Sequence, residues 1–253
     1  MKDISFESVA TEYCEVLKSL PNEYIKMISE DLKISNTKRV TELGCGNGLL
    51  TEALAERCEQ IVGIDISPRM IYLAQSNEKG RAKYVCKDVF LYDYLNNKSD
   101  IIISYESIHL FAPLDELVEK CYLGLNNGGY ICMGWCAYNW ELPLKEIILD
   151  TYKRNGVEWG AWGFSKHYPF YTIINSHKGF SQVSEDVVTL PERWTPEEIV
   201  EYLLSISKSM DLSEDTKMHV KRELLSEINA LGVDFNNETK FYIAYAKKMS
   251  EQK

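Results

Sequence analysis

Three glycines at alternate positions, Gly44, Gly46 and Gly48, separate a buried-type strand from a predicted helix. Residues 39–43 form the apolar, β-branched run, and residues 49–58 have helical periodicity. A glycine turn between a strand and a helix lets a ligand lie against bare backbone, with amide N–H groups and the positive end of the helix dipole directed at it. The stretch therefore predicts a ligand-binding loop, in preference to a turn with a structural role alone.

An acidic residue directly follows the next predicted strand. Residues 60–64 form that strand, and Asp65 follows them, with Ile66 beside it. The carboxyl ends of neighbouring parallel strands meet at one edge of a sheet, so Asp65 is placed to accept hydrogen bonds from both hydroxyls of a ribose. The ligand is therefore expected to contain a nucleoside.

The glycine spacing and a second acid discriminate between nucleotide cofactors. A dinucleotide fingerprint requires a glycine at position 49, which is Leu49 here, and this disfavours a nicotinamide dehydrogenase. Glu42 would repel a pyrophosphate, but it suits a ligand with a cationic end. S-adenosylmethionine has adenine, ribose, an ammonium and a sulfonium, and it has no phosphate.

The run from Glu42 to Gly48, E-L-G-C-G-N-G, together with Asp65 resembles the cofactor motif of class I S-adenosylmethionine-dependent methyltransferases. The stretch from Ser104 to Phe111 resembles the small-molecule ("type 11", trans-aconitate methyltransferase-like) group, where a histidine followed by an apolar–aromatic pair lies in this loop. The resemblance implies a doubly wound, Rossmann-like, seven-stranded α/β sheet, mostly parallel with an antiparallel edge. It also implies S-adenosylmethionine as the cofactor and S-adenosylhomocysteine as the product.

Further cofactor contacts are expected outside the glycine loop. The resemblance implies that Asp88 binds the exocyclic amine of adenine and that the backbone N–H of Val89 meets the ring; a solvated loop acid is the alternative for Asp88. Met70 either packs on the adenine face or belongs to the helix core. Tyr13 belongs to the pattern Phe-x-x-x-Ala-x-x-Tyr of the same group, although Cys14-Glu15 replaces the usual Arg-Pro. The expected cofactor-binding residues are Glu42, Gly44, Gly46, Gly48, Asp65, Ile66, Met70, Asp88, Val89, Ser104 and Tyr13.

His109 is the candidate base. Methyl transfer from a sulfonium is an in-line displacement with an activated donor, so the protein must position the nucleophile, exclude water and, where needed, remove a proton. The ordinary pKa of a histidine lies close to working pH, which suits that last task, and a loop histidine without a catalytic role is the alternative. The chemistry requires no metal, and the sequence offers no cluster with metal-ligand spacing.

Residues 136–179 break the β/α alternation and are rich in aromatic side chains. Four of the five tryptophans fall in or beside this insertion. The prediction is a lid with an acceptor pocket for a flat or hydrophobic molecule, and the alternative is a satellite core that buries its own aromatics. The expected substrate contacts are Tyr138, Trp140, Trp159, Trp162, His167 and Tyr168.

The remaining elements complete a single methyltransferase domain over residues 1–253, with an N-terminal helical cap over residues 1–37. Helices are predicted at 6–33 (two, broken at Leu20-Pro21), 67–75, 113–125, 142–154, 195–209 and 213–232, and strands at 83–86, 100–104, 130–135, 180–190 and 240–246. The polar run Asn126–Gly129 is expected to be a helix-stop turn, the late strands are expected to pair antiparallel, and no clear period is found in residues 155–179.

The composition limits the choice of partner. The net charge of −10 without a strong basic run argues against nucleic acid. Seven cysteines without a C-x-x-C motif, no signal peptide and no apolar run near the ~20 residues of a membrane span indicate a reduced, cytoplasmic protein. The expected partner is a small-molecule acceptor, with no membrane and with the oligomeric state left open. A protein or RNA methyltransferase and a non-catalytic S-adenosylmethionine-binding module are the alternatives.

Overall fold

The computed structural model describes residues 19–77, 80–138, 142–157, 168–205, 212–233 and 235–250, with the backbone alone for Tyr168, Asn236 and Asn237. These residues form two compact units. Among them, unit 1 contains residues 137–157 and 189–240, and unit 2 contains residues 19–136, 168–188 and 241–250, apart from the gaps just given. The predicted insertion 136–179 therefore contributes its first part to unit 1 and its last part to unit 2.

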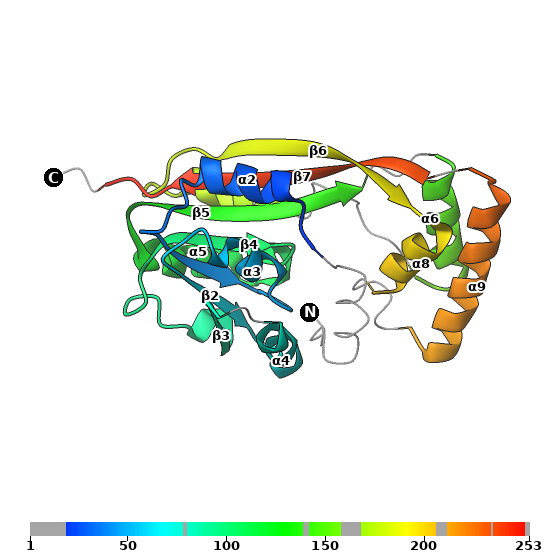
Figure 1. Cartoon of the computed structure of the whole chain (residues 1–253), viewed down its shortest axis with the longest axis horizontal. Coiled ribbons are helices and arrows are strands. Elements are labelled where there is room, and N and C mark those ends of the chain that lie inside the picture. The colour runs from blue at the N-terminus through cyan, green and yellow to red at the C-terminus, as the bar shows by residue number, and fades with distance from the viewer. Residues whose placement is uncertain are drawn as a thin grey trace. The chain divides into compact units, whose positions relative to one another are not determined.

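A seven-stranded sheet with the order β3-β2-β1-β4-β5-β7-β6 forms the framework (Figure 1). Its strands are β1 (Arg39–Leu43), β2 (Gln60–Asp65), β3 (Ala82–Cys86), β4 (Ser99–Tyr105), β5 (Leu125–Tyr138), β6 (Ser184–Trp194) and β7 (Phe235–Lys247). The first five pair in parallel, whereas β7 runs against β5. This confirms the doubly wound, mostly parallel sheet with an antiparallel edge. Within that edge β7 lies between β5 and β6, so β6 is the outermost strand.

The helices of unit 2 alternate with its strands. They are α2 (Asn22–Asp31), α3 (Leu49–Ala55), α4 (Pro68–Ser76), α5 (Leu114–Gly124) and α7 (Tyr168–Ser176), with two 3-10 turns, η1 (Val89–Leu91) and η2 (Ile108–Leu110). Local chemistry sets their starts. In α4, for example, the Ser67 side chain accepts a hydrogen bond from the Met70 N–H at 3.1 Å, and Pro68 occupies the first helical position.

The core of unit 2 surrounds the central strands. Ile101, Ile102 and Ile103 of β4 are consecutive, and each is at most 1% exposed. Since successive side chains of a strand point to opposite faces, both faces of β4 must be covered, as expected for a parallel sheet between two layers of helices.

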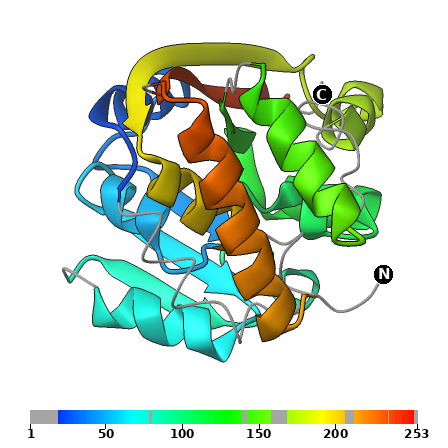
Figure 2. The same cartoon turned by 90° about the vertical axis from the view of Figure 1, so that its right-hand side faces the viewer.

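Unit 1 has its own apolar core between three helices, α6 (Leu144–Arg154), α8 (Pro196–Ser205) and α9 (Glu214–Ala230). Figure 2 shows α9 with α6 and α8 beside it. Ile148, Leu203 and Leu224, one from each helix, are fully buried in this core. The hydroxyl of Tyr152 donates to the backbone oxygen of Leu203 at 2.9 Å and ties α6 to α8.

One local prediction is wrong, and one segment without a predicted element forms a helix. The polar run Asn126–Gly129 is not a turn but part of β5, which follows α5 directly. It pairs with the end of the chain, since Lys248 N–H donates to the Gly129 oxygen and Gly128 N–H donates to the Lys248 oxygen. Residues 168–176, for which no period is evident, form α7. Of the two helices predicted within residues 6–33, α2 is described, and the first lies outside the described residues. None of the described helices has the length and apolar character needed to cross a bilayer.

Candidate cofactor and acceptor site

The carboxyl ends of β1, β2 and β3 lie at one edge of the sheet. Leu43 of β1 is in register with Ile64 of β2, and Asp65 is in register with Cys86 of β3. β4, which ends at Tyr105, pairs with the other side of β1, so the strand order reverses between β1 and β4. Ligands of open α/β sheets bind at such a reversal, outside the carboxyl ends of the strands.

The three glycines adopt the left-handed backbone that the loop requires, with φ of +67° at Gly44, +53° at Gly46 and +83° at Gly48. A Cβ on Gly44 would lie 2.6 Å from both Cβ and Oγ of Ser107, so this position excludes any side chain. Among the described residues beyond its chain neighbours, none comes within 4 Å of the position that a Cβ would take on Gly46. The loop is therefore packed against protein at Gly44 and open at Gly46.

Asp65 connects the glycine loop to the start of α4. Its Oδ2 accepts a hydrogen bond from the Gly46 N–H and its Oδ1 accepts one from the Ser67 N–H, both at 2.9 Å. Each carboxylate oxygen has capacity for a further bond, so these contacts orient the carboxylate and leave it able to accept hydroxyl donors.

Glu42 lies beneath the loop and is 2% exposed. Burial raises the pKa of its carboxyl to about 8, although a hydrogen bond from the Thr51 hydroxyl opposes the shift. The negative charge of Asp65 raises the pKa further. The raised pKa favours the protonated form of Glu42, and the predicted contact of this acid with the cationic end of the ligand stays a prediction.

The residues predicted at adenine follow β2 and β3. The Asp88 carboxylate caps η1 by accepting from the Phe90 N–H at 2.8 Å. Val89 is 5% exposed and Met70 is 3% exposed, so the helix-core interpretation accounts for the burial of Met70. Ile66 is 69% exposed and presents an apolar side chain beside Asp65. Of this group, Ile66 is the side chain with most surface available to a flat ligand.

The loop after β4 is tied to β1 by buried hydroxyls. Ser107 Oγ donates to the Leu43 backbone oxygen at 2.8 Å, and it lies 2.6 Å from Ser104 Oγ, which therefore donates to it. Both serines are buried. His109 follows in η2, two residues after Ser107, and is half-buried. The sequence-predicted Ser104 thus lies near the end of β4, and His109 lies in the loop that follows this strand beside the glycine turn.

Two contacts that support the loop were not predicted as part of the site. Thr51 donates to Glu42, and the Tyr84 hydroxyl, which donates to Glu52 Oε1 at 2.7 Å, occupies the space where a Cβ on Gly48 would lie. A threonine within a helix and a tyrosine within a strand carry no distinguishing sequence pattern. Only their side-chain positions in the folded chain reveal the contacts.

Of the predicted substrate residues, Tyr138 has a described side chain. Its ring packs edge-on against Trp194, with ring centroids 5.2 Å apart, and against Tyr202, with centroids 4.9 Å apart. These aromatics pack on the core of unit 1, as in the satellite-core interpretation. Tyr168, at the start of α7, has a described backbone only, and the other predicted substrate residues lie outside the described residues: Trp140, Trp159, Trp162 and His167. Tyr13, predicted to contact the cofactor, also lies outside them.

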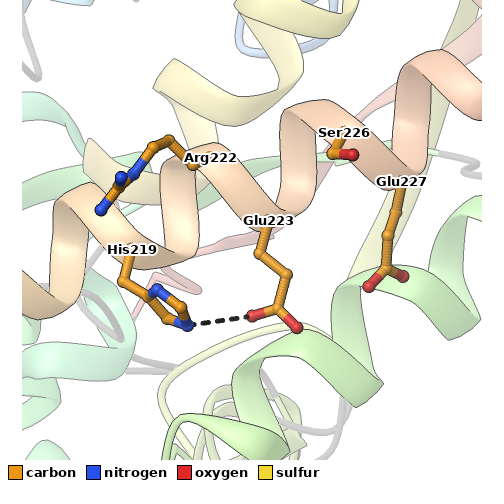
Figure 3. A pocket seen from close by; sticks show the side chains of 5 residues that line it. All are labelled: His219, Arg222, Glu223, Ser226 and Glu227. Atoms are coloured by element: carbon orange, nitrogen blue, oxygen red, sulfur yellow. Dashed lines mark ion pairs between the residues drawn. The ribbon is translucent and has the colours of Figure 1, made fainter.

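A hollow of about 450 Å³ lies along α9 (Figure 3). Its lining residues, His219, Arg222, Glu223, Ser226 and Glu227, are spaced three and four apart, as on one face of a helix. His219 Nε2 lies 3.9 Å from a Glu223 oxygen. This is an exposed helix surface whose Glu223 and Glu227 already pair with Arg154 of α6, and we do not assign a ligand to it. Within the described part of the chain, no group of three or more His, Cys, Asp or Glu side chains is arranged to hold a metal ion.

The fold and the glycine loop define a Rossmann-like α/β protein, and comparison with known proteins shows which proteins the chain resembles. Residues 41–133 match the family model described as a methyltransferase domain. The chain is 24% identical to the ubiquinone biosynthesis O-methyltransferase of Coxiella burnetii over 145 residues, which cover 56% of this chain and 62% of that protein. It is 33% identical to the protein of the same name from Idiomarina loihiensis over 137 residues, covering 53% and 55%.

Solved structures share the fold. The S-adenosylmethionine-dependent methyltransferase of Geobacter sulfurreducens in complex with S-adenosylhomocysteine has a TM-score of 0.58 and 14% identity, covering 95% of this chain and 98% of that one. Residues 41–133 are therefore similar to class I S-adenosylmethionine-dependent methyltransferases, whose methyl donor is S-adenosylmethionine. The matches span about three fifths or less of the length of these curated relatives.

Proposed function

We propose that the protein transfers a methyl group from S-adenosylmethionine to a small molecule at the carboxyl ends of β1 to β4. The observation that carries the proposal is the Asp65 carboxylate, which the Gly46 and Ser67 N–H groups hold beside the open surface of Gly46. An oriented carboxylate next to bare backbone fits a ligand that has ribose hydroxyls and no phosphate. The match of residues 41–133 to the methyltransferase domain model supports the same function.

The residues present fit S-adenosylmethionine. In this proposal Asp65 accepts the ribose hydroxyls, Ile66 covers one face of adenine, and Asp88 with the Val89 N–H binds its edge. The glycine loop lies along the methionine part. When bound, the cofactor supplies a methyl group on a positively charged sulfur, which is already activated for displacement.

His109 is proposed as the base. It lies in the loop that Ser107 ties to the Leu43 oxygen, directly after β4. An imidazole there accepts the proton of the acceptor as its nucleophilic atom takes the methyl group, and the half-buried position limits competing water.

The acceptor is proposed to be small and flat or hydrophobic. Two relatives are named for O-methylation in ubiquinone biosynthesis, and the net charge of −10 disfavours an RNA backbone. Transfer of labelled methyl groups to proteins or RNA in an extract, and not to extractable metabolites, would contradict this acceptor class.

Calorimetric titration tests the cofactor assignment. Protein stripped of carried-over ligand is expected to bind S-adenosylhomocysteine and not NAD. Asp65→Ala should weaken that binding by about 1–3 kcal/mol, because charge-assisted hydrogen bonds are lost. Asp115→Ala, which removes an exposed acid at the start of α5, serves as the matched control with unchanged affinity. Equal affinities of wild type and Asp65→Ala would show that Asp65 does not bind the ribose. If the protein bound neither ligand, the cofactor assignment would fail and only the fold assignment would remain.

His109→Ala tests the base. Turnover is expected to fall by roughly 10²–10⁴-fold, the usual contribution of a positioned acid or base, with S-adenosylhomocysteine affinity nearly unchanged. His219→Ala on the exposed face of α9 is the control with unchanged turnover. If His109→Ala turns over as fast as wild type, His109 is a structural residue.

A further inference from the structure

The backbone of Glu106 is left-handed, with φ of +52°. Within the described ranges, Lys33 is the other non-glycine residue with a positive φ. Side chains rarely adopt this conformation because Cβ crowds the following carbonyl. Glu106 lies directly after β4, which ends at Tyr105, and its own N–H still donates to the Gly134 oxygen of β5 at 2.9 Å. The left-handed residue thus turns the chain out of the sheet immediately after its last bond to β5.

The side chain of Glu106 replaces the backbone pairing that the turn ends. Its Oε1 accepts a hydrogen bond from the Cys136 N–H at 2.6 Å, two residues further along β5 than Gly134. A short bond from a backbone N–H to a carboxylate is stronger than one between neutral groups. A glycine at position 106 would make the same turn without strain, but it would leave this N–H of β5 without the carboxylate. The turn alone therefore does not explain the glutamate, whose carboxylate accepts the hydrogen bond from the Cys136 N–H.

The loop that follows is held on both sides. Glu106 fixes its start to β5, and the Ser107 hydroxyl fixes the next residue to the Leu43 oxygen of β1. His109 comes two residues later in the 3-10 turn η2. The φ of Glu106 sets the direction in which the chain leaves the sheet, and η2 with His109 is the next element along this path.

We propose that Glu106 is a positioning residue, whose carboxylate clamp on the Cys136 N–H holds the His109 loop in its working orientation. The inference rests on the proposed function for the role of His109, although the clamp itself is a property of the fold. What matters in this assignment is an oxygen acceptor at position 106 and not its negative charge.

Nuclear magnetic resonance of the histidine side chains tests the clamp without an identified acceptor. The chain has four histidines, and His109→Ala assigns the signal of His109. In protein saturated with S-adenosylhomocysteine, Glu106→Ala is expected to shift or broaden the His109 imidazole signals and to move its titration midpoint. Glu106→Gln keeps an oxygen acceptor for the Cys136 N–H and should restore the wild-type signals. If Glu106→Ala does not fold, Glu106→Gly removes the same carboxylate while relieving the left-handed strain.

Lys33→Gly is the matched control, since it relieves the same backbone strain at an exposed position in the loop after α2. It should raise the melting temperature and leave the His109 signals unchanged. Unchanged His109 signals in both Glu106→Ala and Glu106→Gly would overturn the proposal, as would equal changes in Glu106→Gln and Glu106→Ala. S-adenosylhomocysteine binding is measured in the same samples. Its absence from wild type would contradict the proposed function, whereas normal binding with an unmoved His109 would contradict the clamp alone.

Discussion

Unit 2 and unit 1 differ in the burial of the carboxyl groups compared here. Unit 2 buries Glu42 beneath the glycine loop, where a threonine hydroxyl is its hydrogen-bond donor and the neighbouring charge is that of Asp65. Unit 1 keeps Glu223 and Glu227 near solvent beside Arg154 and fills its interior with apolar side chains. Burying a polar group is unfavourable unless a hydrogen bond or an opposite charge compensates for the lost contact with water. A buried carboxyl therefore indicates a role other than packing. This contrast is consistent with the proposed site at the strand ends of unit 2, and we expect apolar packing to dominate the stability of unit 1.

The largest effect is expected from a cavity in unit 1. Leu224→Ala truncates a fully buried side chain of α9 and should lower the free energy of unfolding by about 2–5 kcal/mol, because the cavity adds to the lost apolar burial. S-adenosylhomocysteine affinity should stay unchanged at a temperature where the variant is folded. Urea denaturation followed by circular dichroism gives the first quantity and calorimetry the second.

Met218→Ala, on the same helix but 55% exposed, is the control for Leu224→Ala. It should change the free energy of unfolding by less than about 0.5 kcal/mol, as is usual for surface positions. If the Leu224→Ala variant folded but had lost its affinity for S-adenosylhomocysteine, packing in unit 1 and ligand binding in unit 2 would not be independent.

The strand ends of unit 2 were largely predictable from sequence, and physical reasons explain why. β1 spans Arg39–Leu43 as predicted, because an apolar β-branched run bounded by a charged link and by glycine has few alternatives. The start of α4 was equally clear, since Ser67 and Pro68 are the cap and first-turn residues that helices prefer. Local signals of this kind place the backbone of the glycine loop and of Asp65.

Contacts between distant residues were not predictable in the same way. Asn126–Gly129 has the composition of a turn, yet it pairs with Lys248, and nothing within the run shows that a strand from the chain end will cover it. Ser107 closes the space at Gly44, which is more than sixty positions away in sequence. The burial that raises the pKa of Glu42 is likewise set by the packed surroundings of β1 and α3. The sequence places this acid beside the glycine loop, but it does not show how deeply the carboxyl is buried.

The next largest effect tests the buried carboxyl of Glu42. Its pKa is about 8 in the folded protein, against an ordinary value of 4.5, so the folded state binds more protons than the unfolded state between these pH values. The free energy of unfolding therefore decreases as pH rises through that window, by up to about 1.4 kcal/mol per pH unit from this group. Glu42→Gln has no proton to lose and should remove this part of the slope.

The measurement for Glu42 is the difference in free energy of unfolding between wild type and Glu42→Gln across pH 5 to 8.5, since other groups contribute equally to both. Glu56→Gln, at an exposed position after α3, provides the matched control and should retain the wild-type slope. Parallel curves for wild type and Glu42→Gln would show that Glu42 titrates normally, and the contrast in how the two units treat carboxyl groups would be lost.

The smallest effect is expected from the surface pairs of unit 1. Arg154 Nε lies 2.8 Å from Glu223 and its Nη2 lies 2.5 Å from Glu227, with the arginine side chain 47% exposed. Exposed ion pairs contribute little because solvent screens them and two long side chains must be ordered. Arg154→Ala should therefore lower the free energy of unfolding only slightly, and the difference from wild type should shrink as salt is added.

Arg154→Ala also bears on the comparison of the two units. Arg154 Nη2 contacts the hydroxyl of Thr151, which is fully buried, so the substitution removes one contact from the interior along with the surface pairs. Arg154→Lys keeps the charge and removes the planar group that reaches Thr151, which separates the two contributions. A loss above about 2 kcal/mol that persists at high salt would mean that unit 1, like unit 2, depends on polar contacts in its interior. A small, salt-sensitive loss in the free energy of unfolding would support apolar packing as the main source of stability in unit 1. The strand ends of unit 2 would then remain the region where we propose that buried polar groups serve the reaction.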